Sequence, residues 1–253
     1  MEQPVHFYNH QGEKLTGTLH RPDNPTHYGV VFGHCFTCSR HTSILRHICT
    51  ELEAEAFMAL RFDFSGNGQS QGRFDESTFS KQIQEMEIAA AFIAEKGALR
   101  IGLAGHSMGA VIAILTAARM STINPVCALA GRLSGLNATH FLRQSQRKEL
   151  DDTGRVFFNS RGRSLQLSTG FFADAGQYNL LETITNLKTP LLIVHGDRDE
   201  IVPIQEAYLA EKLNRENTTL AIFPGADHMF SQKECRQQVS ESVVNWFKKH
   251  ISE

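Results

Sequence analysis

The chain has 253 residues and a formal net charge of −2, from 25 Lys and Arg against 27 Asp and Glu. This balance argues against a nucleic-acid partner, because there is no basic excess to displace phosphate counterions. No apolar run approaches the roughly 20 residues of a membrane span. Because a chain of this length buries roughly three-quarters of its unfolded surface, its core needs no metal or disulfide.

In chain order, eight apolar or β-branched runs predict strands, at 5–8, 14–20, 28–32, 57–64, 100–104, 126–130, 190–195 and 218–223. Helical patterns fall between the later strands, at 43–55, 79–96, 108–120, 204–213 and 235–250. This alternation predicts a mostly parallel sheet with helices on both faces, because parallel strands are joined by crossovers.

The segment 131–178 interrupts the alternation. Within it, 156–158 and 165–167 read as the two strands of a β-hairpin around a turn at 159–162. We expect a cap inserted into one domain that spans residues 1–253. Between residues 132 and 163 there are seven basic residues and three acidic ones, which could steer an anionic substrate or form a solvated face.

The strongest local motif is Gly105-x-Ser107-x-Gly109, which follows a predicted strand and opens a predicted helix. This is the setting of a nucleophile elbow, in which the serine stands on a strained turn between flanking glycines. A glycine-rich turn with an incidental serine is the alternative. The helix N-terminus behind Ser107 offers unsatisfied N–H groups to a developing negative charge.

A serine nucleophile needs a histidine base, and the base needs a carboxylate to orient it. His228 lies in a turn-rich loop after the last predicted strand, where parallel sheets place catalytic groups. His106 adjoins Ser107 and is expected to point away. Asp197 and Asp199 both follow the preceding strand, and the order Ser107, Asp199, His228 suits this type of sheet.

Five cysteines, at 35, 38, 49, 127 and 235, do not form the even set of a secreted disulfide framework. With no basic and apolar start resembling a signal peptide, the simplest interpretation is a reduced cytoplasmic chain. Cys35-x-x-Cys38 has the spacing of metal or redox motifs, but its loop is not in a thioredoxin-like unit. We expect no metal and no cofactor, with an oxidation-sensitive thiol as a side hypothesis.

Taken together, five segments resemble the α/β-hydrolase superfamily: 33–37, 61–70, 105–109, 195–203 and 225–228. Within it, the chain resembles small serine esterases of the feruloyl/cinnamoyl-esterase type and the hydrolase domain elsewhere fused to an OsmC-like domain. The resemblance implies an α/β-hydrolase fold with an eight-stranded sheet and a small hairpin-containing cap. One departure is Cys35, where such esterases commonly carry glycine.

The resemblance also implies that Asp199, rather than Asp197, is the acid and that the backbone N–H groups of Phe36 and Met108 form the oxyanion hole. It predicts a serine carboxylesterase that acts on a small-molecule ester through an acyl-enzyme. An acyl-CoA thioesterase is the main alternative, and a non-catalytic hydrolase-fold binding protein is a second class. A homodimer is an option that the sequence leaves open.

Overall fold

The computed structural model describes residues 2–136 and 142–251. Its main sheet has eight strands in the spatial order β1-β2-β4-β3-β5-β6-β9-β10. The first two pairings, β1 with β2 and β2 with β4, are antiparallel, and the others are parallel. These strands are β1 (Glu2–Tyr8), β2 (Lys14–His20), β3 (Tyr28–Gly33), β4 (Met58–Phe62), β5 (Arg100–His106), β6 (Ile123–Leu129), β9 (Leu191–Gly196) and β10 (Thr218–Phe223). The predicted α/β-hydrolase fold is confirmed.

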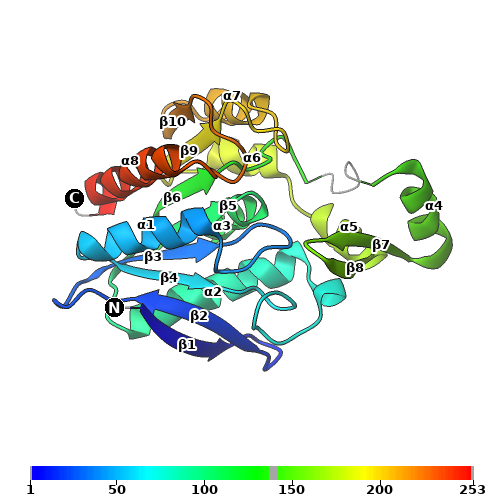
Figure 1. Cartoon of the computed structure of the whole chain (residues 1–253), viewed down its shortest axis with the longest axis horizontal. Helices are drawn as coiled ribbons and strands as arrows, with labels where there is room; N and C mark the ends of the chain where they lie inside the picture. Colours follow the sequence, from blue (N-terminus) through cyan, green and yellow to red (C-terminus); the bar gives the residue numbers. More distant parts are fainter. Residues whose placement is uncertain (1, 137–141, 252–253) are drawn as a thin grey trace.

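Helices cover both faces of this sheet, as Figure 1 shows for α1 and α8 above it and α2 below. The central strands, such as β3, β4 and β9, are buried on both sides because their apolar residues alternate between two cores. In β3, for example, Val31 packs into the core under α2 and α3, whereas Val30 and Phe32 pack under α1 and α8. The helices predicted from the sequence are α1 (Ser43–Ala54), α2 (Phe79–Glu95), α3 (Met108–Arg119), α7 (Gln205–Leu213) and α8 (Lys233–Ile251).

The segment between β6 and β9 forms the cap and its return to the sheet. Its hairpin joins β7 (Arg155–Ser160) to β8 (Arg163–Ser168) through Arg161 and Gly162, which have φ values of 52° and 73°. Two positive φ values are the requirement of a two-residue turn that matches the strand twist. The hairpin is therefore confirmed, with a tighter turn than the sequence suggested.

Three helices and one 3-10 turn were not predicted from the sequence. They are η1 (Phe74–Glu76), α4 (Gln144–Thr153), α5 (Thr169–Ala175) and α6 (Leu180–Asn186). In Figure 1 the hairpin and α4 stand away from the sheet, whereas α6 lies against it. Of the predicted cap, 131–178, the part 137–141 lies outside the described residues.

Candidate active site

Ser107 lies at the sharp turn between β5 and α3. Its backbone has φ 56° and ψ −113°, a region that is strained for a residue with a side chain. Its N–H donates to the carbonyl of Leu129 at 2.8 Å, which ties the turn to β6. A Cβ atom at Gly105 would overlap the backbone of Gly109, and one at Gly109 would overlap the carbonyl of Gly33. Glycine at both positions therefore lets α3 approach the sheet while Ser107 stays half-buried.

Asp199 and His228 meet in the loops that follow β9 and β10. His228 Nδ1 lies 2.7 Å from Asp199 Oδ2, and the Asp199 side chain is fully buried. The other carboxylate oxygen accepts the backbone N–H groups of Ile201 at 2.9 Å and Val202 at 2.8 Å. Because Nδ1 donates to the carboxylate, the lone pair of neutral His228 lies on Nε2, as a general base requires.

The Asp199 carboxylate is stabilised in its ionised form. Burial acts to raise the pKa of this carboxyl, but the hydrogen bonds and charge of His228 and the backbone N–H groups outweigh burial and lower the pKa. Asp199 therefore stays negative where it can hold the His228 ring and stabilise its protonated form. This is the task that the sequence interpretation gave to it.

Ser107 follows β5, and His228 follows β10. These two strands belong to the same half of the sheet, in which β5, β6, β9 and β10 are neighbours in that order. Within residues 2–136 and 142–251, no hydrogen bond joins the two side chains. Such bonds are often long before a substrate binds and tighten in the complex. The three candidate residues are thus arranged as one bonded pair, Asp199 with His228, and a serine on the adjacent turn.

His106 corrects one sequence expectation, because its ring does not point away from the site. It packs against the His228 ring with centroids 4.9 Å apart, and its Nε2 lies 2.7 Å from the His228 carbonyl oxygen. Burial, together with the neighbouring His228, lowers the pKa of His106 to about 3. A neutral His106 therefore donates Nε2–H to the backbone of His228 and holds the loop that carries the base.

The two expected oxyanion donors, Phe36 and Met108, border the same cavity as Ser107. Met108 opens α3, so its N–H lies in the first helical turn, where backbone N–H groups have no acceptor inside the helix. Phe36 lies in the loop after β3 and lines the same cavity. This arrangement suits two amides that receive one negative oxygen.

Hydrogen bonds of His34 and a disulfide hold the loop that carries Phe36. His34 Nδ1 donates to the carbonyl of Cys35 at 2.7 Å, and His34 Nε2 accepts the N–H of Phe64 at 3.1 Å. A disulfide joins Cys35 to Cys38, with Cα atoms 5.2 Å apart. The expectation of a fully reduced chain therefore differs from the structure at this one pair. The remaining cysteines are free and buried, at 49, 127 and 235.

An apolar cavity of about 250 Å³ lies beside the serine. Its walls come from both the sheet side and the cap, including Val111 of α3 and Phe171 of α5. Phe171 is 2% exposed and lies 5.7 Å from Phe36, ring centroid to ring centroid. Arg132 is the one charged residue in the described lining. A site of this kind accommodates an apolar acyl group next to the nucleophile.

Comparison with known proteins supports this picture. The model of the prolyl oligopeptidase family, Peptidase_S9, matches residues 79–253, which contain the nucleophile elbow and both later loops. The chain belongs to the prolyl oligopeptidase family. As a member of this family it is an α/β hydrolase, and its fold and hydrolase class are those expected from the sequence.

Among curated relatives of this family member, mouse ABHD10, a mitochondrial palmitoyl-protein thioesterase, is 26% identical over 180 residues. That match covers 69% of this chain and 60% of the mouse protein. The uncharacterized peptidase YuxL of Bacillus subtilis is 36% identical over 77 residues, only 12% of its length. A monoacylglycerol lipase of Mycolicibacterium smegmatis is 20% identical over 95% of both chains.

Solved structures extend the likeness to nearly the whole chain. Est1E from Butyrivibrio proteoclasticus, solved with ferulic acid, superposes with a TM-score of 0.86 over 98% of this chain and all of that chain, at 24% identity. The esterase domain of a Rhodothermus marinus protein gives a TM-score of 0.78 at 25% identity, over 99% of both chains. The Est1E likeness shows the hydrolase fold. Across residues 2–136 and 142–251, no helix combines the length and apolar character needed to cross a bilayer.

Glu206, at the start of α7, has a structural role in this chain that was not predicted from the sequence. Its buried carboxylate accepts the N–H groups of Leu133 at 2.8 Å and Ser134 at 2.5 Å, and the Ser134 hydroxyl at 2.8 Å. Arg132 approaches the same carboxylate at 3.4 Å. We call this the Glu206 clamp. It fixes the point at which the chain leaves β6 for the cap, and no local pattern signals a contact 73 residues apart.

A second buried network supports the Phe36 loop. Asp63, after β4, accepts the Arg40 backbone N–H at 2.6 Å and forms an ion pair with the Arg40 guanidinium. Arg61 donates to the Arg40 carbonyl at 3.0 Å. Both Arg61 and Asp63 lie in a segment that carries the family resemblance, but only the structure shows that they hold the loop after β3.

The other aspartates of these loops have structural partners. Asp197 accepts the N–H of Gly225 at 2.6 Å, which joins the β9 and β10 loops. Asp227 accepts the N–H groups of Met229 at 3.1 Å and Ser231 at 2.9 Å. Asp197 therefore joins the two loops that carry Asp199 and His228.

Proposed function

We propose that this chain is a serine hydrolase that cleaves carboxylic esters through an acyl-enzyme. The observation that carries the proposal is the buried Asp199–His228 pair beside a strained serine at the edge of an apolar cavity. We also propose that residues 1–253 form one domain, with 131–178 as its cap over this site.

In the first half-reaction, Ser107 Oγ attacks the acyl carbonyl while His228 Nε2 takes its proton. The N–H groups of Phe36 and Met108 stabilise the oxyanion, and such a donor contributes about 3–4 kcal/mol to the transition state. His228 then gives its proton to the departing alcohol oxygen. Water, activated by His228, attacks the acyl-enzyme and releases the acid, and Ser107 recovers its proton. Asp199 keeps the imidazolium oriented throughout.

A thioester is the second candidate substrate. The supporting observation is the name of the mouse relative, a palmitoyl-protein thioesterase. The chemistry is the same except that the leaving atom is sulfur. The family name makes a prolyl peptide a further substrate to assay.

Labelling with a fluorophosphonate probe and hydrolysis of p-nitrophenyl butyrate test the proposal. We expect the wild type to react in both assays. Ser107→Ala should abolish labelling and reduce kcat by about 10⁴-fold or more, because the nucleophile is lost. The matched control is Ser121→Ala, at an exposed serine in the turn after α3. Equal labelling of wild type and Ser107→Ala would falsify the enzyme proposal.

A further inference from the structure

A second pocket, of about 470 Å³, lies between the loop after β3 and the turn of the hairpin. It differs from the acyl cavity in being lined by hydroxyl and cationic groups. We call it the arginine pocket; its described lining is Thr37, Cys38, Ser39, His41, Thr42, Ser43, Gly68, Arg161, Arg163 and Met229. That lining contains two guanidinium groups and no carboxylate.

The two arginines have no acidic partner in residues 2–136 and 142–251. Arg163 donates to the Thr37 carbonyl at 3.0 Å, and Arg161 Nη2 lies 3.9 Å from the Met229 sulfur. The carboxylate that acts on His41 is Asp63, which is fully buried and already bound to arginine. A positive charge without a local counter-charge favours an anion from outside the chain.

The start of α1 adds to the positive electrostatic potential of the arginine pocket. Thr42 is the residue before the helix, and its side chain makes no cap hydrogen bond to the first turn. The first turn also contains no acidic residue. Its N–H groups therefore retain their capacity to bind an anion, and the positive end of the helix dipole adds to the two arginines.

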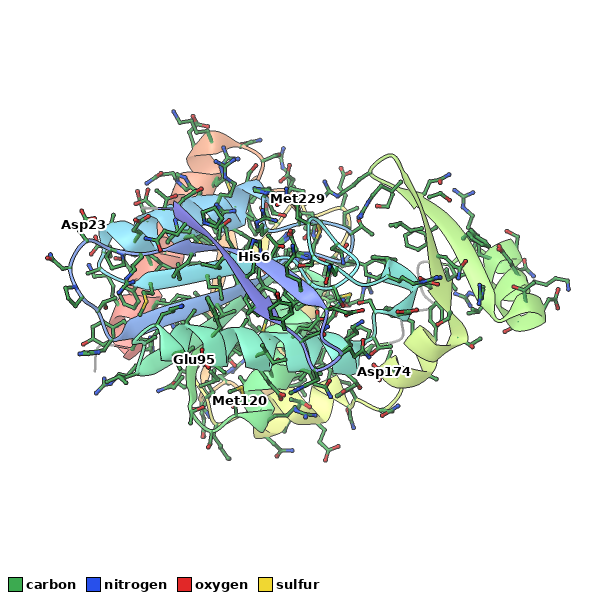
Figure 2. All side chains as sticks on the ribbon, turned by 90° about the horizontal axis from the view of Figure 1, so that it is seen from below. His6, Asp23, Glu95, Met120, Asp174 and Met229 are labelled. Carbon is green, nitrogen blue, oxygen red and sulfur yellow. A yellow bond between two sulfur atoms is a disulfide. The ribbon has the colours of Figure 1, made fainter. Side chains whose placement is uncertain are left out.

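The lining of the arginine pocket includes the sequence neighbours of two proposed site residues. Thr37 follows Phe36, the proposed oxyanion donor, and Met229 follows His228, the proposed base. Figure 2 shows Met229 on the part of the molecule nearer the hairpin, away from Asp23 and Glu95 at the other end. Since His228 must reach the leaving atom to protonate it, the leaving group extends on the His228 side, whereas the acyl group occupies the apolar cavity.

We infer that the arginine pocket binds a phosphate group on the alcohol or thiol part of the substrate. The inference rests on the proposed function and names its substrate class. The reaction joins water to an acyl ester or thioester, releasing a carboxylic acid and a phosphorylated alcohol or thiol whose oxygen or sulfur receives the proton of His228. Guanidinium forks, hydroxyls and helix N–H groups are the donors that phosphate oxygens accept.

Two matched substrate pairs separate the sources of such a phosphate. Butyryl-CoA is compared with S-butyryl-N-acetylcysteamine, and 1-butyryl-glycerol 3-phosphate with 1-monobutyrin. In at least one pair, kcat/KM of the wild type should be about tenfold or more in favour of the phosphorylated member. Arg161→Gln should bring that ratio close to one, and Arg155→Gln, an exposed arginine at the base of the hairpin, should preserve it. Raising the salt concentration should lower the wild-type ratio.

Binding provides a readout that does not depend on turnover. Coenzyme A and glycerol 3-phosphate are titrated calorimetrically into the Ser107→Ala variant. At least one should bind about tenfold more weakly when Arg161→Gln is added, and equally well when Arg155→Gln is added. The inference is overturned if neither compound binds, or if the affinity of each compound is unchanged by Arg161→Gln.

The two failures are distinguishable. Ser107-dependent turnover with no preference for either phosphorylated substrate defeats the arginine pocket and leaves the hydrolase proposal standing. Absence of Ser107-dependent turnover on all four substrates, together with Arg161-dependent binding, defeats the hydrolase proposal and supports the pocket as a phosphate site.

Discussion

The sheet with its covering helices is more deeply buried than the outer part of the cap, which consists of α4 and the hairpin turn. The Asp199 side chain and His106 are fully buried, and each is fixed by short hydrogen bonds. In α4 of the cap, by contrast, Leu150 is the one buried residue, and the hairpin turn is exposed. We therefore expect the proposed chemistry to depend on the rigid sheet and the proposed substrate selection to depend on the more exposed cap.

The two regions meet through aromatic rings around the proposed oxyanion loop. Phe158 of the hairpin stacks on Phe36 with centroids 5.9 Å apart and planes at 9°. Phe171 of α5 contacts Phe79 at 5.5 Å. The Phe36 ring also lies 5.7 Å from the Phe171 ring, centroid to centroid, so two elements of the cap pack against the proposed oxyanion donor.

A pair of aspartates tests the comparison with the largest expected effect. Asp199→Asn removes the acceptor that selects the His228 tautomer, so kcat should fall about 10⁴-fold. Asp174→Asn, in the cap, weakens bonds to the N–H of Ser80 at 2.9 Å and to its hydroxyl at 2.5 Å. It should raise KM and cost about 1 kcal/mol of stability. Steady-state kinetics and urea unfolding measure both, and a kcat loss as large for Asp174→Asn would break the comparison.

A pair of glycines gives the next effect. Alanine at Gly105 would overlap the Gly109 backbone, so the variant should lose about 3 kcal/mol or fail to fold. Gly154, after α4, has open space around the added methyl group but a φ of 73°. Its alanine variant should lose about 1 kcal/mol, the cost of a left-handed alanine. Urea unfolding distinguishes them, and equal losses would contradict a rigid sheet beside a tolerant cap.

The pH dependence of stability gives the smallest effect. Burial, with the Arg61 charge, lowers the pKa of His20 to about 4, whereas the unfolded chain titrates near about 6.5. Between these values the unfolded state binds more protons, so stability falls as pH falls, by up to about 1.4 kcal/mol per pH unit. In His20→Gln this dependence should be shallower between pH 6.5 and 4. If the unfolding free energies of the wild type and of His20→Gln fall with the same slope, His20 does not contribute to this pH dependence.

The same division explains what could be predicted from the sequence. Apolar runs such as 191–194 are visible locally, so the eight strands and their covering helices were predicted. Helix α4 was missed because its sequence is polar except for Leu150, and α5 and α6 are seven residues each, too short for a clear period.

For the candidate site, the elbow at Ser107 and the order of the later loops were readable because both are local patterns. The packing of the His106 ring against His228 was not predicted, since it depends on how two loops meet. The Glu206 clamp and the Cys35–Cys38 bond likewise depend on tertiary contact or redox state, which composition does not reveal.

The Glu206 clamp also bears on how much of the cap can be replaced. Two of its hydrogen bonds come from backbone N–H groups, which every residue except proline supplies. This part of the clamp does not depend on the side chains at 133 and 134, whereas the Ser134 hydroxyl and the Arg132 guanidinium add contacts that do. Replacing the segment beyond Ser134 should therefore leave these two hydrogen bonds and the end of β6 in place.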